Sequence, residues 1–210
     1  MRPRAPPPEN AGVPVRNRVT PAGEIVDIPL RGAWTGNRGV LHRGHEIVRF
    51  HGGDLWITCA LTFKDRWREQ WLPHRYTHLY FHDEAVSFAA GHRPCGECRR
   101  PAYTAYRDAW PGSPSAGEMN RRLHAERLVR GSHTRRLHEL SWAELPDGVF
   151  VLRDDHPELK VDGHLTEWTT AGYGRKQQLP RAGTVPVLTP PATIAVLRAG
   201  YPVQIDDRAR

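Results

Sequence analysis

Two cysteines three positions apart are the residues of this chain best suited to chemistry. Cys95 and Cys98 lie near the end of the stretch FHDEAVSFAAGHRPCGECRR, residues 81–100. Thiolates at this spacing can both reach one tetrahedral metal ion of the zinc type. Gly96 between them suits a tight bend of the backbone around the ion. The sequence therefore predicts half of a zinc site, whose other ligands must come from elsewhere in the chain.

The third cysteine, Cys59, has two interpretations. In the segment LWITCALTF, alternation with a period of two places Cys59 on one face of a strand with Leu55, Ile57, Leu61 and Phe63. Such an apolar face normally belongs to the core, and free cysteines are commonly buried as small hydrophobic residues. The cysteine pair still needs further ligands, however, so Cys59 is also a candidate for the third metal ligand.

A histidine would have to complete the site, because the chain has only three cysteines. The histidines near the pair in the sequence are His74, His78, His82 and His92. Spacing does not distinguish them, and we take His78 as the candidate ligand. A surface position is the competing interpretation for each of the four.

Residues 81–100 also resemble the end of the metal-binding domain of Ada-type DNA alkylation-repair proteins, a zinc knuckle with the run A-G-F-R-P-C-x-x-C-R. The matching residues are Phe81, Glu84, Ala85, Ala89, Gly91, Arg93, Pro94, Cys95 and Cys98. The resemblance covers roughly 20 of the 210 residues, and it implies zinc and DNA. The family has two upstream cysteines spaced C-x-x-x-C, one of which accepts a methyl group, whereas this chain has only Cys59 there. The resemblance therefore implies that this chain binds zinc, but it does not imply that the chain transfers methyl groups.

The positive charge of the chain is concentrated after the cysteine pair. The net charge is +7, and only three of the 30 basic residues are lysines. Residues 91–140 contain ten arginines and five acidic residues. Such a block favours contact with nucleic-acid phosphates, although a solvated surface is the simpler alternative. The arginines that we expect to contact nucleic acid are Arg93, Arg99, Arg100, Arg121, Arg122 and Arg127.

Two histidines of this basic block are candidates for catalysis. His124 in LHAERL and His138 in TRRLHEL could each act as a general base, with neighbouring arginines stabilising a pentavalent phosphate. A solvated helical face explains the same composition. The sequence has no H-E-x-x-H helix, no G-x-S-x-G elbow, no P-loop and no HNH pattern. A hydrolase is therefore an alternative to a binding protein.

Local signals predict four helices. The first has Asp83 as its N-cap and ends at Gly91, and the second has Pro101 in its first turn. Ser115 and Glu118 form a capping box for the third, which continues to about Leu128. The fourth is expected to have Thr189 as its cap, Pro190 as its first residue and Gly200 at its exit.

Strands are predicted on both sides of these helices. Residues 46–50 and 55–63 are expected to form one hairpin, and Asp162 with Gly163 marks another hairpin between residues 159–161 and 164–168. Residues 172–178, GYGRKQQ, are predicted to be a polar loop. The pattern favours an α+β fold with short antiparallel strands and three to four helices, stapled by zinc. Residues 1–21 are expected to be a flexible, basic, proline-rich tail, and residues 22–210 one domain.

Composition narrows the function further. Three cysteines, no opening signal peptide and no apolar stretch of membrane-spanning length lead us to expect a reducing cytoplasm. The leading hypothesis is a zinc-stabilised protein that binds nucleic acid, DNA rather than RNA, in repair or processing. One alternative is a metal-dependent nuclease or other phosphodiester hydrolase that uses His124 or His138. Another is a structural zinc-stapled protein with an acidic protein partner.

Overall fold

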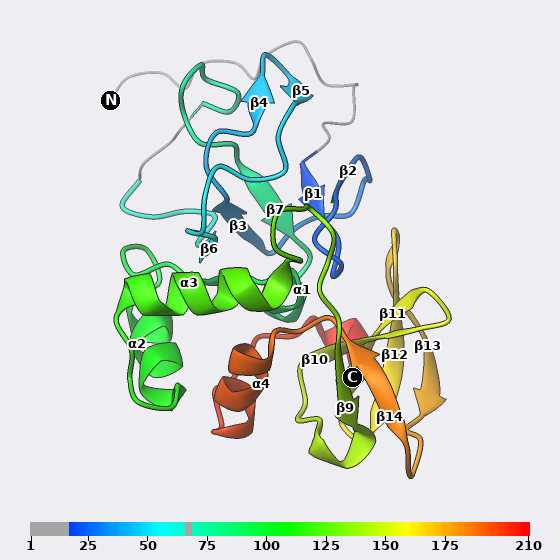
Figure 1. Ribbon diagram of the computed structural model, residues 1–210. Coiled ribbons are helices and arrows are strands. Elements are labelled where there is room, and N and C mark those ends of the chain that lie inside the picture. Colours follow the sequence, from blue (N-terminus) through cyan, green and yellow to red (C-terminus); the bar gives the residue numbers. More distant parts are fainter. Residues whose placement is uncertain (1–16, 66–68) are drawn as a thin grey trace.

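The computed structural model describes residues 17–65 and 69–210, which form two six-stranded sheets with four α-helices (Figure 1). This arrangement confirms the predicted α+β class with short, mostly antiparallel strands. The predicted tail lies outside the described residues up to residue 16. Its last part, from Asn17, already belongs to the fold, because Val19 is a buried strand residue. Within the described part of the chain, no helix is both long and apolar enough to cross a membrane.

The first sheet has the strand order β2-β1-β7-β3-β6-β8. Its strands in chain order are β1 (Arg18–Val19), β2 (Ile25–Val26), β3 (Trp34–Asn37), β6 (Ile57–Cys59), β7 (Leu79–Phe81) and β8 (Arg93–Pro94). β1 is parallel to β7 and β6 is parallel to β8, whereas the other neighbours are antiparallel. Two further strands, β4 (His42–Arg43) and β5 (Glu46–Ile47), form a separate hairpin.

The second sheet is antiparallel throughout, in the order β13-β12-β11-β10-β14-β9. Its strands are β9 (His138–Ser141), β10 (Val149–Arg153), β11 (His156–Val161), β12 (His164–Thr169), β13 (Gly172–Gln178) and β14 (Thr184–Val187). Asp162 and Gly163 join β11 to β12, which confirms that hairpin. The loop predicted for residues 172–178 is wrong, because this segment pairs with β12 as strand β13 while most of its polar side chains face solvent.

The helices divide the hydrophobic core into two parts. α1 (Glu84–Ala89) lies between the sheets (Figure 1), and its residues Ala85, Val86 and Ala89 share one core cluster with Phe81 of β7 and Phe150 of β10. The second cluster joins residues of the second sheet to Phe88 of α1 and to the remaining helices, which are α2 (Arg100–Ala109), α3 (Ala116–Arg127) and α4 (Pro191–Arg198). Two short 3-10 helices, η1 (Trp142–Glu144) and η2 (Asp207–Ala209), complete the described elements.

Most of the predicted helix ends are confirmed. The Asp83 side chain accepts a hydrogen bond from the backbone N–H of Val86 at 2.8 Å, as an N-cap should. The capping box of Ser115 and Glu118 begins α3. The fourth helix begins one residue later than predicted, after Pro190, because the Thr189 hydroxyl instead accepts from the backbone N–H of Phe150 at 2.9 Å.

The hairpin predicted between residues 46–50 and 55–63 is wrong. β5 pairs with β4, whereas β6 pairs with β3 and β8. The buried face of this segment is also the opposite of the predicted one. Trp56 is 1% exposed and Thr58 is fully buried, whereas Leu55 is 47% exposed. Because successive strand residues point to opposite faces, the face of Cys59 lies away from the core.

Gly91 ends the turn after α1 at a position that other residues fit poorly. Its φ is +85°, and an added Cβ would lie 2.5 Å from Cδ of Arg127. Gly91→Ala is therefore expected to lower the free energy of unfolding by at least about 2 kcal/mol, as measured by urea denaturation. Gly96→Ala is the control, because its Cβ would meet the Tyr103 ring at an ordinary 3.7 Å. Equal losses in the two variants would contradict this account.

Candidate functional site

The three cysteines come together in space. The sulfur atoms of Cys59, Cys95 and Cys98 all lie within 4.8 Å of one another. This group could hold a metal ion, and it places Cys59 where a third sulfur ligand would be needed. Three protein ligands leave the fourth position of a tetrahedral ion to a ligand from outside the group, such as water.

The strand pairing explains why Cys59 reaches the pair. β6 and β8 are parallel neighbours, with Thr58 opposite Pro94, and the backbone N–H of Cys95 donates to the Thr58 carbonyl at 2.9 Å. Cys59, the last residue of β6, and Cys95, the residue after β8, therefore lie side by side. The backbone N–H of Glu97 then donates to Sγ of Cys95, and that of Ala60 donates to Sγ of Cys98, each at 3.4 Å. Such bonds orient the sulfurs.

The electrostatics of the three thiols fit a divalent metal ion. Hydrogen bonds from the Cys59 and Cys98 side chains lower the pKa of Cys95, although partial burial opposes this effect. The hydrogen bonds to Cys95 and Cys98, together with burial, raise the pKa of Cys59. A bound dication would stabilise all three as thiolates, because metal binding deprotonates its sulfur ligands.

The histidine predicted as fourth ligand is not part of this group. Among the described residues, the group of potential ligand atoms contains the three sulfurs and no histidine, so the structure does not bring His78 to the cysteines. His78 instead lies against Tyr76, with ring centroids 4.9 Å apart. His92 is fully buried, where it accepts a hydrogen bond from Nε of Arg38 at 3.2 Å.

Half of the arginines predicted to contact phosphates are buried. Arg93 donates to Oδ1 of Asn120 at 2.8 Å, and Arg99 forms a 2.6 Å ion pair with Glu84. Arg127 is fully buried and donates to the Gly91 carbonyl at 2.8 Å. The expectation that Arg93, Arg99 and Arg127 contact nucleic acid does not fit these positions, because all three side chains are buried and bonded within the protein. The other three predicted arginines, Arg100, Arg121 and Arg122, are exposed.

A basic cavity of about 610 Å³ opens beside α3. We call it the histidine cavity. Its lining includes three histidines and three arginines, which are His51, His124, His133, Arg121, Arg130 and Arg136. Asp54 is the one acidic residue among its described lining residues. The loop before β6, the end of α3 and the segment after α3 thus surround one positively charged hollow.

The three histidines of this cavity are neighbours. The ring centroid of His51 lies 5.1 Å from that of His124 and 5.5 Å from that of His133. Desolvation and the nearby positive charges lower the pKa of His51. Desolvation and Arg127 lower the pKa of His124, whereas Asp54 opposes this shift. Both imidazoles are therefore neutral at neutral pH.

Buried positive charge lies directly behind the histidine cavity. Nη2 of Arg127 lies 3.0 Å from Nδ1 of His124 and 2.8 Å from the Asp54 carbonyl oxygen. The guanidinium carbons of Arg38 and Arg127 lie 4.1 Å and 3.8 Å from the ring centroid of Trp56. Among the described residues, neither arginine forms a salt bridge with a carboxylate. Burial lowers the pKa of both, but a guanidinium keeps its charge at neutral pH.

Only one of the two predicted catalytic histidines belongs to the cavity. His124 lines it, whereas Nε2 of His138 lies 2.8 Å from the Glu126 carbonyl oxygen and outside the cavity lining. The prediction from sequence missed His51 and His133. The only local signals for them were a glycine after His51, in HGGD, and a glycine before His133, in RGSH. Such signals predict turns rather than a shared cavity.

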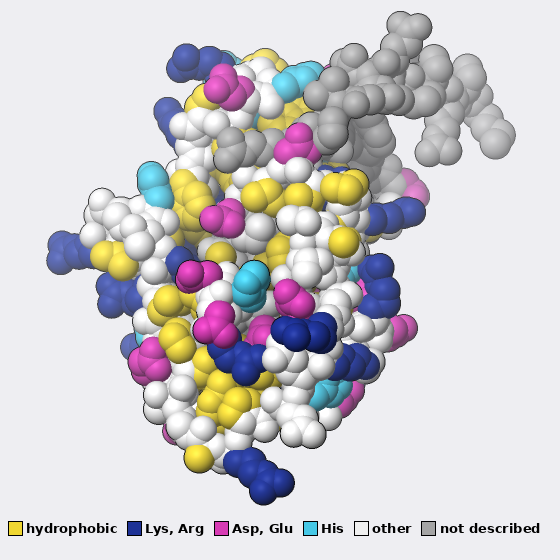
Figure 2. Space-filling view, turned by 90° about the vertical axis from the view of Figure 1, so that its right-hand side faces the viewer, with side chains coloured by type: hydrophobic (Ala, Val, Ile, Leu, Met, Phe, Trp, Pro, Cys, Tyr) yellow, Lys and Arg dark blue, Asp and Glu magenta, His cyan; other side chains and the backbone are white. Residues whose placement is uncertain are grey.

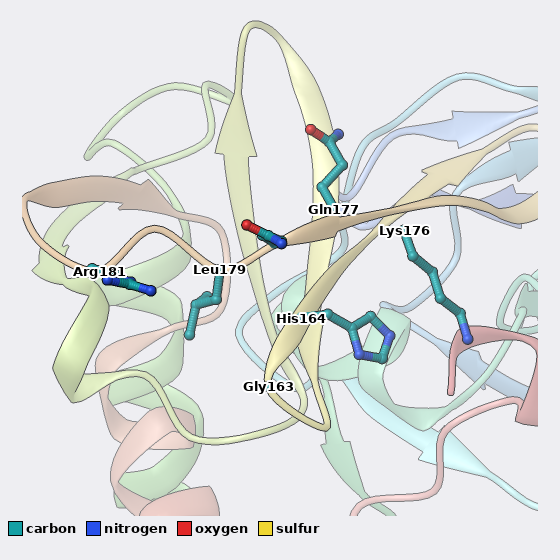
Figure 3. A pocket seen from close by; sticks show the side chains of 7 residues that line it. Gly163, His164, Lys176, Gln177, Leu179 and Arg181 are labelled. Atoms are coloured by element: carbon teal, nitrogen blue, oxygen red, sulfur yellow. The ribbon is translucent and has the colours of Figure 1, made fainter.

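A second, shallower cavity of about 500 Å³ lies at β12 and β13, where Figure 3 shows Arg181 and Leu179 on one side of the strands and His164 and Lys176 on the other. Two of its polar side chains, His164 and Lys176, already have partners. Nε2 of His164 lies 3.2 Å from the Ala209 carbonyl oxygen, and Lys176 donates to the carbonyl of the last residue. Figure 2, which views the side where β13 lies, shows basic and acidic side chains interspersed. This face is therefore a weaker anion-binding candidate than the histidine cavity.

Comparisons with protein families, with curated proteins and with solved structures find no match to this chain.

Proposed function

We propose that this chain binds nucleic acid through the histidine cavity, and that zinc at Cys59, Cys95 and Cys98 stabilises the fold that presents it. The observation that carries the proposal is the cavity lining, which combines three arginines and three histidines with one carboxylate. Arginine forms bidentate hydrogen bonds with phosphate, and its positive charge attracts the nucleic-acid backbone.

The proposed zinc site and the histidine cavity are linked through β6. Cys59 ends this strand, and Trp56, which contacts both buried arginines, directly precedes it. An ion that joins Cys59 to Cys95 would fix β6 against β8 and so hold Trp56 in place. Sulfur ligands favour zinc over magnesium or calcium. The resemblance of residues 81–100 to Ada-type modules favours DNA over RNA.

A salt series tests the proposal. Affinity for single-stranded and duplex DNA and for RNA of the same sequence should fall steeply with salt, as measured by fluorescence anisotropy. The double variant Arg121→Gln/Arg130→Gln removes two exposed charges at the cavity, so the slope of log K against log salt should become shallower by about 1 to 2. Arg175→Gln/Arg181→Gln is the control, because it removes the same charge from β13 and its neighbouring loop.

The same samples distinguish the alternatives. A flat salt response, or equal effects of the two double variants, would contradict binding at the histidine cavity. Cleavage of the oligonucleotides that His124→Ala abolishes would support the hydrolase, which His124 and its neighbour His51 would serve as proton-transfer groups. No binding to any oligonucleotide would favour the structural alternative with an acidic protein partner.

A further inference from the structure

We propose that the histidine cavity holds a terminal phosphate of the nucleic acid, a phosphomonoester, rather than an internal phosphodiester. This inference rests on the proposed function, because it names the part of the nucleic acid that the cavity selects. Three features of the described residues support it: unpaired buried charge, imidazole nitrogens without protein partners, and the size of the cavity.

The positive charges of Arg38 and Arg127 are not neutralised by any carboxylate among the described residues. Arg127 donates through Nη1 to the Gly91 carbonyl and through Nη2 to the Asp54 carbonyl, both at 2.8 Å. Its Nε and Nη2 of Arg38 are buried without a hydrogen-bond partner among the described residues. Buried charges are rarely left unpaired. A phosphomonoester carries up to two negative charges, and a phosphodiester carries one, so the monoester balances this site better.

The imidazoles offer both a donor and an acceptor. Because the Arg127 guanidinium can only donate, Nδ1 of His124 accepts from it at 3.0 Å, and neutral His124 carries its proton on Nε2. Nδ1 of His51 is buried without a partner among the described residues. A phosphomonoester, whose second pKa is about 6, is mostly a dianion at neutral pH, and its three terminal oxygens can accept from imidazole N–H groups. A phosphodiester has only two terminal oxygens and one negative charge.

The size of the cavity suits the end of a strand. Its volume of about 610 Å³ is in the range of small-molecule pockets, which suits one nucleotide rather than a duplex. The segment after α3 forms one wall. This segment turns back on itself, because the backbone N–H of Val129 donates to the Thr134 carbonyl at 3.0 Å and that of Arg136 donates to the Arg127 carbonyl at 3.1 Å.

Binding of the phosphate should be linked to proton uptake. The groups that lower the pKa of His51, besides desolvation, are His124, His133, Arg127 and Arg38. Arg127 also lowers the pKa of His124, whereas Asp54 raises it. Three more arginines of the cavity lining, Arg121, Arg130 and Arg136, add positive charge. A phosphate dianion opposes these charges and raises the pKa of both imidazoles. The complex therefore holds more protons, and its affinity rises as the pH falls from about 8 to about 6.5.

The test compares oligonucleotide ends on the full chain with its metal ion. Single-stranded DNA of one sequence carries either a phosphate or a hydroxyl at its 5′ end, with the dye at the other end, and a second pair varies the 3′ end. We expect about tenfold tighter binding of the phosphorylated form at one of the two ends. Inorganic phosphate should compete with that form, and the ratio of affinities should be larger at pH 6.5 than at pH 8.

Variants locate the effect. His51→Ala should reduce the ratio between phosphate- and hydroxyl-ended DNA to about twofold or less, whereas His156→Ala, at an exposed position of β11, should keep it. The comparison in the wild-type protein needs no variant, so it stands even if His51→Ala fails to fold. Equal affinity for both ends, with binding retained, would overturn the terminal-phosphate inference alone. No binding to any of the oligonucleotides would overturn the proposed function as well.

Discussion

Replacing Cys95 with serine is expected to remove the metal ion and to lower the free energy of unfolding by about 3 kcal/mol or more. Cys95 is buried and lies within 4.8 Å of both other sulfurs, so no other described side chain of the group can take its place. A serine hydroxyl stays protonated near neutral pH and is a poor zinc ligand. Elemental analysis of the purified protein and urea denaturation measure the two losses.

A control and a chelator make this result specific. Gly96→Ala changes the same loop without removing a sulfur, and it should keep both the metal ion and the stability. A strong chelator should lower the stability of the wild type to that of Cys95→Ser and should leave the variant unchanged. If the wild-type protein contains no metal and Cys95→Ser unfolds like it, the zinc proposal is wrong.

The parts of the fold that the sequence predicted well depend on short-range chemistry. A cap, a capping box or a two-residue hairpin involves residues a few positions apart. Asp83, the Ser115–Glu118 pair and the Asp162–Gly163 turn were therefore recognisable without knowledge of the rest of the chain. The spacing of Cys95 and Cys98 is equally local.

The candidate sites depend on contacts between distant segments, and these were not predictable from patterns. Cys59 joins the pair because β6 and β8 are parallel neighbours, which no spacing in the sequence encodes. Composition counts arginines but does not say which of them are buried. Arg99 is buried where its guanidinium pairs with Glu84 and stacks on Trp34. Arg127 is buried where its guanidinium stacks on Trp56.

Removing the charge of Glu84 is expected to cost about 3 kcal/mol of stability or more. Oε1 of Glu84 lies 2.6 Å from Nη2 of Arg99 and accepts from the Tyr201 hydroxyl at 2.9 Å, while Oε2 accepts from the backbone N–H of Gln204 at 3.0 Å. Glu84→Gln keeps the shape of the side chain but leaves the Arg99 guanidinium, 8% exposed, without its counter-charge. The stacking of Arg99 on Trp34, at 3.8 Å, offsets only part of that cost. Urea denaturation measures the loss.

Two comparisons separate a buried pair from a surface pair. Asp162→Asn breaks the exposed pair with Arg210, whose two side chains are about half exposed, and it should cost no more than about 1 kcal/mol. The double variant Glu84→Gln/Arg99→Met should regain much of the stability that Glu84→Gln loses, because it leaves no unpaired buried charge. A double variant that loses the sum of its single variants would mean that the pair is not coupled. Since Arg99 directly follows Cys98, coupling would also show that this ion pair anchors the cysteine loop to α1 and to the segment of Tyr201 and Gln204.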